Sequence, residues 1–258
     1  MEKIIKTKTK SGKINNKNVL FFKNSKFIHS YIDNYYYIII INNLIIDTKR
    51  KEEKIFVIKI LKNFYCIEGI DGSGKTSIIN KLKTICKNES RYYFTKEPSS
   101  GIIGEMIKEQ LMNFKNPLKE SIFAYLYAAD RHDHLYKKGG ILEILNTKST
   151  KIITDRYLFS SIAYQGKLGY ELNKNFPLPE KVFFIKIDPK IAYERIQKNR
   201  TQSDLFELEK YKTFEQITLK YLKTFKKIEK TINVIYIDNS IKDNLDKNAE
   251  KIFNLIKF

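Results

Sequence analysis

From about residue 61 onwards, apolar runs of strand length alternate with longer amphipathic stretches. The short runs are rich in β-branched and aromatic residues, which predicts strands at 63–68, 91–95, 151–154, 182–187 and 233–237. The stretches between them carry apolar residues on one face, which predicts helices at 74–87, 101–113, 117–136, 157–164, 189–199, 206–230 and 241–257, with one more ending near 146. This alternation predicts an α/β fold, with a parallel sheet of about five strands and helices on both faces.

Residues 1–60 follow a different pattern. Their first half is rich in Lys and Asn, is nearly free of acidic residues and has no sustained period, so we expect it to be partly disordered. Two apolar runs, 35–41 and 44–46, flank an Asn-Asn pair and predict a hairpin, and 54–61 predicts a further strand. None of these runs is amphipathic enough to form its own core. We therefore expect a basic, Lys/Asn/Ile-rich N-terminal extension, 1–60, followed by one domain, 61–258.

The chain is strongly basic, with a formal net charge of +19 at pH 7. Such a charge suggests nucleic acid as a partner. Its distribution weakens that interpretation, because residues 1–62 hold 14 Lys and Arg against 5 Asp and Glu and the remaining excess is spread along the chain. A basic cleft would also suit anionic nucleotides. We favour a solvated, lysine-rich surface and do not expect nucleic acid as a partner.

The sequence gives no sign of a membrane or of a disulfide framework. No apolar run approaches the roughly 20 residues of a membrane-spanning helix. Cys66 in a predicted strand and Cys86 near the end of the next helix have no metal-ligand spacing, and are typical of buried residues in a reducing compartment. The N-terminus lacks the features of a transit peptide or a secretory signal. We therefore expect a cytoplasmic protein.

One complete phosphate-binding motif follows the predicted strand 63–68 and leads into the predicted helix 74–87. The pattern G-x-x-x-x-G-K-[ST] is filled by Gly69, Ile70, Asp71, Gly72, Ser73, Gly74, Lys75 and Thr76. In this context backbone N–H groups and a helix N-terminus converge on phosphate oxygens. Lys75 would reach the outer phosphates, and the Thr76 hydroxyl would ligate Mg²⁺. A chance glycine-rich turn would not explain why a strand, the loop, Lys75-Thr76 and a helix follow one another in the order that phosphate binding requires. The motif therefore predicts binding of a nucleoside triphosphate.

Two further polar motifs follow predicted strands. Glu97-Pro98 follows the second strand, and Asp155-Arg156 follows the third. Ligands of parallel sheets bind at the carboxyl ends of strands, so both motifs are expected near the phosphate loop. The Asp155 carboxylate can hold Mg²⁺ through water, and the Arg156 guanidinium can bind two phosphate oxygens. A buried structural Asp–Arg pair is the alternative, and it competes more strongly for Asp155 than for Arg156.

Tyr127 and Arg131 are four residues apart on one face of a predicted helix. An aromatic ring in this position can stack on a pyrimidine while the guanidinium donates to a carbonyl. A core stripe of aromatic residues would explain Tyr127 but not Arg131. Asp71 is a carboxylate in a loop that serves a polyanion, so it requires a positively charged or hydroxyl partner.

In this order and spacing, the motifs resemble the thymidylate kinase family. The resemblance covers about 195 residues, from Phe64 to the C-terminus, and rests on the segments 67–76, 95–98, 127–131, 155–157, 160–166 and 187–189. It implies a P-loop kinase fold with a short lid. It also implies ATP as phosphoryl donor, Mg²⁺ as cofactor, phosphorylation of dTMP to dTDP for dTTP synthesis, and a homodimer formed through the helices around 101–136 and 157–166.

The resemblance also implies roles for the matched residues. The acceptor nucleotide would be bound by Asp71, Glu97, Lys108, Tyr127, Arg131, Arg156, Ser161 and Tyr164. Within this set, Asp71 would bind the deoxyribose 3′-OH and Arg156 the acceptor phosphate. Thymine would stack on Tyr127, accept at O4 from Arg131 and present its N3 edge to Ser161, with Tyr164 beside C2′. Catalysis would rest on Lys75, Arg156, Asp71 and Arg200, the last of these in the lid.

Three positions depart from the family pattern. Ser99-Ser100 replaces a pair of glycines after Glu97-Pro98, which makes that turn stiffer. Lys108 stands where an arginine is usual, and keeps the charge without the forked geometry. Leu205 stands in the lid where an Asp-Arg pair is expected, although the lid keeps Arg195 and Arg200.

Two other functions stay open at this point. A deoxynucleoside kinase shares the Glu-Pro and Asp-Arg motifs and would require a general base, for which Glu68 or Glu97 is available. A nucleic-acid-binding protein on a degenerate kinase fold would use the basic N-terminus as an arm. The intact Lys75, Thr76 and Asp155-Arg156 argue against degeneration.

Overall fold

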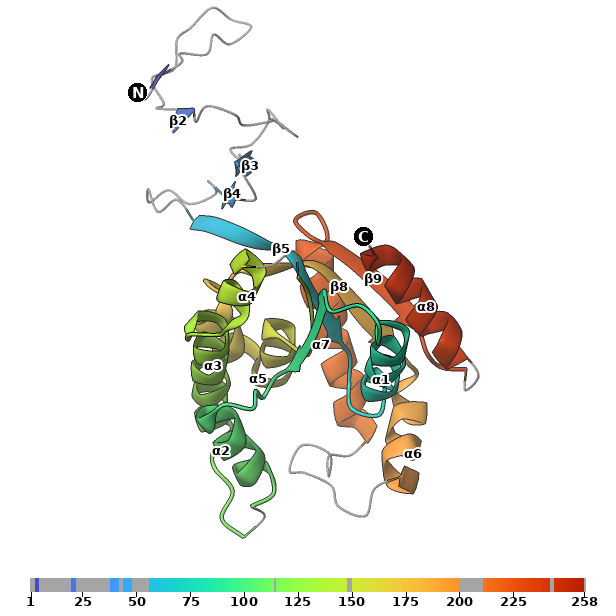
Figure 1. Ribbon diagram of the computed structural model, residues 1–258. Helices are drawn as coiled ribbons and strands as arrows, with labels where there is room; N and C mark the ends of the chain where they lie inside the picture. Colours follow the sequence, from blue (N-terminus) through green and yellow to red (C-terminus); the bar gives the residue numbers. More distant parts are fainter. Residues whose placement is uncertain are drawn as a thin grey trace, which may run out of the picture. The chain divides into compact units, whose positions relative to one another are not determined.

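Figure 1 shows a computed structural model of the chain. The structure describes four short strands, β1 (Lys3–Ile4), β2 (Leu20–Phe21), β3 (Ile38–Ile41) and β4 (Leu44–Asp47), and residues 56–113, 115–147, 150–199, 211–241 and 244–257. The backbone divides into two compact units, Met1–Ile60 and Leu61–Phe258. The partial disorder predicted for the first half of the extension concerns residues that, apart from β1 and β2, lie outside the described part.

The first unit contains only antiparallel strand pairs among its described residues. β1 pairs with β2, and β3 pairs with β4 so that Ile41 lies opposite Leu44. The predicted hairpin is therefore confirmed. β4 also pairs with the first residues of β5 (Phe56–Glu68), with Leu44 opposite Lys59.

β5 is one strand where the sequence predicted two. The polar residues between 61 and 64 suggested a boundary, but the strand continues through them. Asn63, inside the strand, has a left-handed backbone (φ 61°), which Asn tolerates better than most residues. Its N–H group donates to Glu180 Oε2 at 2.7 Å. The prediction of a separate strand at 54–61 was therefore wrong.

The second unit is built on a parallel sheet of five strands, as predicted. The strand order is β6 (Tyr92–Lys96), β7 (Lys151–Asp155), β5, β8 (Leu178–Lys186) and β9 (Asn233–Asp238), so that β5 is central. Eight helices are described in this unit: α1 (Lys75–Ile85), α2 (Ile102–Leu111), α3 (Glu120–Tyr136), α4 (Ile141–Thr147), α5 (Leu158–Asn173), α6 (Pro189–Asn199), α7 (Tyr211–Ile228) and α8 (Leu245–Ile256). The predicted alternation of strands and helices is thus confirmed.

Most element ends lie within a few residues of the prediction, and α6 matches it fully. α5 differs most, because it was expected to end at 164. Gly166 breaks the helix with a left-handed backbone (φ 58°, ψ −127°), after which the chain resumes helical geometry as far as Asn173. The predicted end at 164 therefore lies close to a break in the helix and not at its end.

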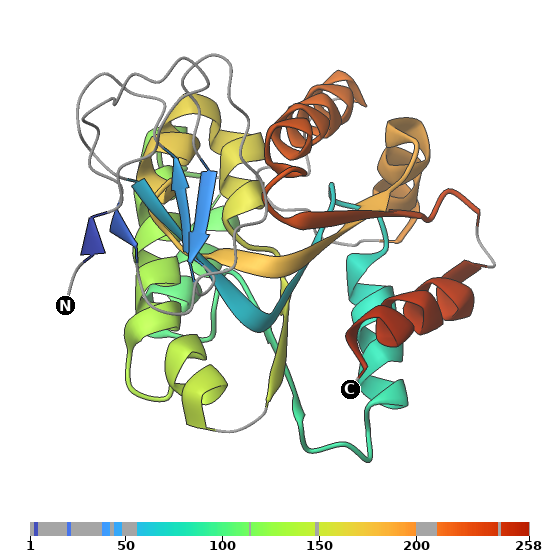
Figure 2. The same ribbon diagram turned by 90° about the horizontal axis from the view of Figure 1, so that it is seen from above.

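Helices cover both faces of the sheet (Figures 1 and 2). On one face, α1 and α8 lie side by side and enclose a buried apolar cluster that includes Tyr65, Ile67, Ile153, Phe183, Ile185 and Ile237 of the strands. On the other face, aromatic rings of α7 and of the residue before α5 pack on the strands. The ring centroids of Phe184 and Phe225 are 5.1 Å apart, and those of Phe64 and Tyr157 are also 5.1 Å apart. Alternate residues of β5 therefore serve opposite faces, as a strand's period of two requires.

The carboxyl ends of three neighbouring strands meet at one edge of the sheet. Asp155, the last residue of β7, lies opposite Ile67 of β5 and Lys96 of β6. The phosphate loop, Glu97-Pro98 and Asp155-Arg156 begin at this edge, as predicted. In the part of the chain that the structure describes, none of the helices has the length and apolar character needed to cross a membrane.

Candidate active site

The phosphate loop requires its glycines. Gly72 has φ 73°, and a Cβ atom there would lie 2.3 Å from the carbonyl oxygen of Ala192 in α6. Gly74 has φ 91°, and its Cβ would lie 2.4 Å from Nδ2 of Asn239. Real side chains never approach so closely, so the loop has this path only because these residues lack a Cβ.

Lys75 is the first residue of α1, and its side chain folds back over the loop. Its Nζ donates to the carbonyl oxygens of Gly69 at 3.0 Å and Ile70 at 2.9 Å. Burial, followed by repulsion from the nearby Arg156 cation, lowers the pKa of Lys75 to about 8. A positive charge is thus held at a cost in the loop, where phosphate oxygens would stabilise it.

Arg156 reaches from the end of β7 to the phosphate loop. Its Nη1 donates to Gly69 O at 3.2 Å and to Ser160 Oγ at 3.0 Å, and its Nη2 is paired with Asp71. The second oxygen of Asp71 accepts a hydrogen bond from the Tyr164 hydroxyl at 2.8 Å. The positive and hydroxyl partners that Asp71 was expected to require are therefore supplied by the protein itself.

Glu68 joins the end of β5 to the beginning of α5. Its carboxylate accepts hydrogen bonds from the backbone N–H groups of Tyr157 at 2.9 Å and Ser160 at 3.2 Å, from Ser160 Oγ at 2.7 Å and from the Tyr221 hydroxyl at 3.0 Å. It is fully buried, and burial raises the pKa of this carboxyl group. Because Ser160 also accepts from Arg156, Glu68 positions the guanidinium indirectly.

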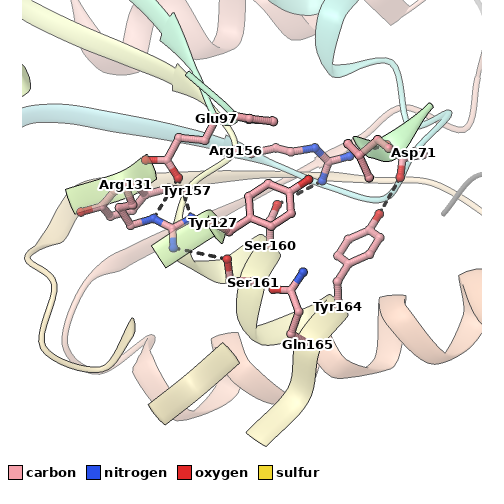
Figure 3. A pocket seen from close by; sticks show the side chains of 12 residues that line it. Asp71, Glu97, Tyr127, Arg131, Arg156, Tyr157, Ser160, Ser161, Tyr164 and Gln165 are labelled. Carbon is pink, nitrogen blue, oxygen red and sulfur yellow. Dashed lines mark hydrogen bonds and ion pairs between the residues drawn. The ribbon is translucent and has the colours of Figure 1, made fainter. Parts of the chain in front are cut away.

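A pocket lies between the phosphate loop, α3 and α5 (Figure 3). It is lined by Asp71, Glu97, Pro98, Leu111, Tyr127, Arg131, Arg156, Tyr157, Ser160, Ser161, Tyr164 and Gln165. The Asp71–Arg156–Tyr164 group stands at one end, and the Arg131–Glu97–Ser161 group stands at the other. The pocket therefore carries one guanidinium beside the phosphate loop and a second one away from it.

Arg131 is 1% exposed and is held by protein groups on two sides. Its Nε and Nη2 donate to Glu97 Oε2 at 2.8 and 2.5 Å. Its Nη1 donates to Ser161 Oγ at 3.3 Å and to Asn173 Oδ1. Arg131 is thus a buried, fixed group in the pocket wall, and Ser161 and Glu97 contact it directly.

Glu97 also faces His134 of α3. Glu97 Oε1 and His134 Nδ1 are 3.5 Å apart, and neither has a hydrogen-bond partner among the described residues. The other ring nitrogen of His134 lies 2.7 Å from Thr95 Oγ1. The buried Glu97 carboxylate is therefore enclosed by Arg131 and by an oriented imidazole.

The Ser99 substitution noted in the sequence is accommodated by Asp130. Ser99 donates from its backbone N–H to Asp130 Oδ2 at 2.8 Å and from its hydroxyl to Oδ1 at 2.6 Å. The Ser99 hydroxyl also accepts from the Gly101 N–H at 3.0 Å. These bonds anchor the turn after Glu97-Pro98 to the helix that carries Tyr127 and Arg131.

This geometry agrees with comparisons to known proteins. The thymidylate kinase of Aster yellows witches'-broom phytoplasma is 33% identical to this chain over 209 residues, which cover 75% of this chain and 94% of that protein. The thymidylate kinase of Mycoplasma genitalium is 32% identical over 208 residues, which cover 75% and 93%. A probable thymidylate kinase of Sulfurisphaera tokodaii is 33% identical over 207 residues, which cover 76% and 99%. The family model described as thymidylate kinase matches residues 67–248.

The chain belongs to the thymidylate kinase family. Seven of the eight acceptor-site residues expected from the thymidylate kinase resemblance line the single pocket described above. The exception is Lys108, whose Nζ donates to Ser99 O at 2.8 Å and to Glu105 Oε1 at 2.6 Å. Arg200 and Leu205, expected in the lid of a thymidylate kinase, lie outside the described residues.

Tyr127 has two environments in this thymidylate kinase fold. It packs against the apolar cluster of Ile107, Leu111 and Phe123, and it also lines the pocket. The core-stripe alternative for Tyr127 therefore describes one side of the ring, while the other side faces the place where a base could stack.

Several residues of the site were not anticipated from the sequence. His134 lies 3.5 Å from the Glu97 carboxylate, and Asn173 accepts a hydrogen bond from Arg131. Gln165 lines the pocket with an Oε1 atom that is buried and has no hydrogen-bond partner among the described residues. Asn239 holds the phosphate loop through a 2.8 Å bond to Ser73 O. Gln165 could have been found from its place next to Tyr164, whereas the others act across long sequence separations.

Proposed function

We propose that this chain transfers the γ-phosphoryl group of ATP to dTMP and releases dTDP and ADP. The observation that carries the proposal is a pocket with Arg156 at the phosphate-loop end and Arg131 with Tyr127 at the other end. A nucleoside monophosphate has the same polarity, with an anionic phosphate at one end and a flat base with carbonyl groups at the other. The phosphate loop would hold the donor at the anionic end of the acceptor.

The chemistry requires positioning and charge neutralisation rather than a covalent intermediate. Lys75 exchanges its two loop carbonyls for donor phosphate oxygens. Arg156, already aligned by Ser160, neutralises charge that the donor and the acceptor share. Asp71 would orient the sugar, and its pair with Arg156 would hold the guanidinium at the junction of the two substrates.

Mg²⁺ is part of this proposal, and the residues present fit it. Asp155 Oδ1 is buried at the end of β7 and has no hydrogen-bond partner among the described residues, while Thr76 is exposed beside Lys75. Among the described residues no group of three or more His, Cys, Asp or Glu side chains could hold a metal, which agrees with an ion held mainly by phosphates. Asp155, through water, and the Thr76 hydroxyl would hold the ion, which would supply positive charge to the phosphates of the donor.

Base choice would rest on Arg131. A guanidinium can only donate, so it can donate to the O4 carbonyl of thymine but opposes the 4-amino group of cytosine, which is also a donor. Two donors facing each other without water would each stay unpaired, at about 1–3 kcal/mol per group. The enzyme should therefore use dTMP in preference to dCMP. Gln165, with its unpartnered Oε1, is a second polar group available to the base.

A homodimer is also part of the proposal. Large apolar side chains of α2 and α3 are exposed, including Ile102 at 88% and Tyr125 at 55%. A second copy of the chain would cover such side chains, which are costly to leave in water. The expected cytoplasmic location belongs to the same proposal, and the two buried free cysteines fit a reducing compartment.

The test is ADP release, measured in a coupled assay with dTMP, thymidine, dUMP, dCMP or no acceptor. We expect release with dTMP, weaker release with dCMP and none with thymidine, because Arg156 would lack its anionic partner. Strong activity with thymidine would instead indicate a deoxynucleoside kinase. Glu68 is poorly suited to the general base of that reaction, since it does not line the pocket and its two oxygens already accept hydrogen bonds from Cys66, Tyr157, Ser160 and Tyr221.

A further inference from the structure

Asn173 ends the second half of α5 and reaches the pocket wall from behind. The break at Gly166 turns this half of the helix back on the first half. The turn brings Gly169 so close to Ser161 that a Cβ on Gly169 would lie 2.1 Å from the Ser161 carbonyl oxygen. Asn173 itself is 1% exposed.

The amide of Asn173 has a defined orientation. Its Nδ2 donates to the carbonyl oxygen of Gly169 at 2.7 Å, and its Oδ1 accepts from Nη1 of Arg131. With the amide reversed, Oδ1 would face the Gly169 carbonyl oxygen, so that two acceptors oppose each other, and Nδ2 would face the Arg131 guanidinium, so that two donors oppose each other. Asn173 therefore presents an acceptor, and only an acceptor, to Arg131.

The hydrogen bonds that Arg131 donates to the protein use four of its five N–H groups. An arginine side chain has five N–H bonds. Glu97 receives those of Nε and one of Nη2, and the two of Nη1 go to Ser161 and Asn173. The remaining N–H, on Nη2, has no partner among the described residues. The guanidinium also lies over the Tyr157 ring, 5.2 Å from its centroid, which fixes its plane.

We propose that Asn173 is a positioning residue for base selection in this pocket. By occupying one N–H of Nη1, it fixes the guanidinium so that a single N–H of Arg131 faces the base of the acceptor nucleotide. This inference rests on the proposed use of dTMP. Without Asn173, Arg131 has a spare N–H and can rotate within the plane set by Tyr157, so its hydrogen bond to a base carbonyl weakens and its opposition to an amino group is relieved.

The test compares two isosteric variants. Asn173→Leu removes the acceptor without leaving a cavity, and Asn173→Asp keeps an acceptor oxygen of the same reach. With Asn173→Leu we expect KM for dTMP to rise about tenfold, kcat to change little and the dTMP:dCMP ratio of kcat/KM to fall about tenfold, as for one lost hydrogen bond to a charged group. With Asn173→Asp we expect this ratio to stay near that of the wild type. KM for ATP should not change in either variant.

The loss of a buried amide away from the base end of the pocket is controlled with Asn248→Leu. Asn248 is a buried amide at 7% exposure that donates to the Asp238 carbonyl at 2.9 Å and does not line the pocket. We expect it to lower the melting temperature and leave the dTMP:dCMP ratio unchanged. If Asn173→Leu does not fold, Asn173→Ser, which is too short to reach Arg131, should show the same fall in the ratio.

Two results would overturn the role of Asn173. One is a wild-type ratio in the Leu or Ser variant, and the other is an equal fall in the Leu and Asp variants. Either result leaves the proposed function intact, provided that the wild-type enzyme releases ADP with dTMP. If the wild-type enzyme does not, the proposed function itself fails, whatever the variants do.

Discussion

The side chain of Asn239 donates a hydrogen bond to the main-chain carbonyl of Ser73 at 2.8 Å. This bond ties the carboxyl end of β9 to the middle of the phosphate loop. Asn239 Oδ1 in turn accepts from Nδ2 of Asn248 in α8, at 3.1 Å. The last strand and the last helix of the sheet therefore support the loop from behind, although they contain no part of the phosphate-binding motif.

Asn239→Asp should weaken ATP binding specifically. The change places a carboxylate oxygen where a donor faced the Ser73 carbonyl, so two acceptors oppose each other and the loop shifts. We expect KM for ATP to rise about tenfold, since an unpaired buried polar group costs about 1–3 kcal/mol. KM for dTMP should stay close to that of the wild type. Steady-state kinetics with each substrate varied separately would check this, and a change confined to dTMP would contradict it.

Substitution of two glycines that share the same φ distinguishes the effect of close packing from the effect of backbone strain. Gly72 and Gly139 both have φ 73°, but a Cβ on Gly139 would meet nothing within 4 Å. Gly139→Ala should lose only about 1–2 kcal/mol of stability from the left-handed backbone. Gly72→Ala must also displace the loop from Ala192, so kcat/KM for ATP should fall on the order of 10²-fold. Equal activity in the two variants would show that α6 does not constrain the loop.

The pKa of Lys75 predicts how stability and ATP affinity depend on pH. Between pH 8 and 10.5 the folded protein has largely lost the proton of Lys75 and the unfolded chain has kept it. The unfolded state then binds more protons, so this group makes the free energy of unfolding rise with pH in that window. ATP favours the charged amine, so ATP affinity should fall as pH rises above 8.

Calorimetry of ATP binding in buffers with different ionisation enthalpies would check this. Above pH 8 we expect proton uptake on binding, which Lys75→Met should abolish. Lys81→Met changes a lysine paired with Asp246 on the surface, and it should keep the uptake. We also expect Lys75→Ala to reduce kcat by about 10²–10³, as for other preorganised charges.

Replacement of each pocket arginine by glutamine should have a different effect on the preference between dTMP and dCMP. Arg156→Gln should depress the use of dTMP and dCMP alike, because a phosphate contact carries no information about the base. Arg131→Gln should bring kcat/KM for dTMP closer to that for dCMP. It should also reduce the free energy of unfolding by about 3–5 kcal/mol, because it leaves the buried Glu97 carboxylate without its cation. Kinetics with both acceptors and chemical unfolding would measure the two effects. Addition of Glu97→Gln to Arg131→Gln should restore part of the stability.

Residues 1–55 should be dispensable for catalysis. Every pocket residue belongs to the unit Leu61–Phe258, and a chain that begins at Phe56 keeps β5 whole. We expect unchanged kcat and KM in such a chain. Insolubility or loss of activity would show that the extension supports the kinase domain. Salt-dependent DNA binding that disappears with the extension would favour the nucleic-acid alternative.

The sequence was sufficient for those parts of the site that are local. The phosphate loop and Asp155-Arg156 follow apolar runs directly, so their place at the carboxyl ends of strands could be predicted from neighbouring residues. Arg131 could be placed on the same helix face as Tyr127, but its environment could not be predicted. Its partners Glu97 and Asn173 are 34 and 42 residues away, and only the packed fold brings them together.

The same limit applies to the elements. Asn63 and Gly166 interrupt apolar patterns in the way that strand and helix ends do, and the chain continues past both. What continues β5 and α5 is packing on neighbouring segments. That packing includes the bond from Asn63 N to Glu180 and the contact of Gly169 with Ser161, and neither can be inferred from a local pattern.

The central position of β5 has a consequence for how the domain folds. β5 is the first strand of the parallel sheet to be synthesised, yet its neighbours β7 and β8 begin only at Lys151 and Leu178. Until β7 has emerged from the ribosome, the strand that carries the phosphate loop has two unpaired edges in this sheet, and one edge stays unpaired until β8 has emerged. Pairings of such high contact order form slowly and expose apolar strands to aggregation. Variants that slow docking of β7 or β8 should therefore reduce the yield of folded enzyme more than they reduce the activity of the molecules that do fold.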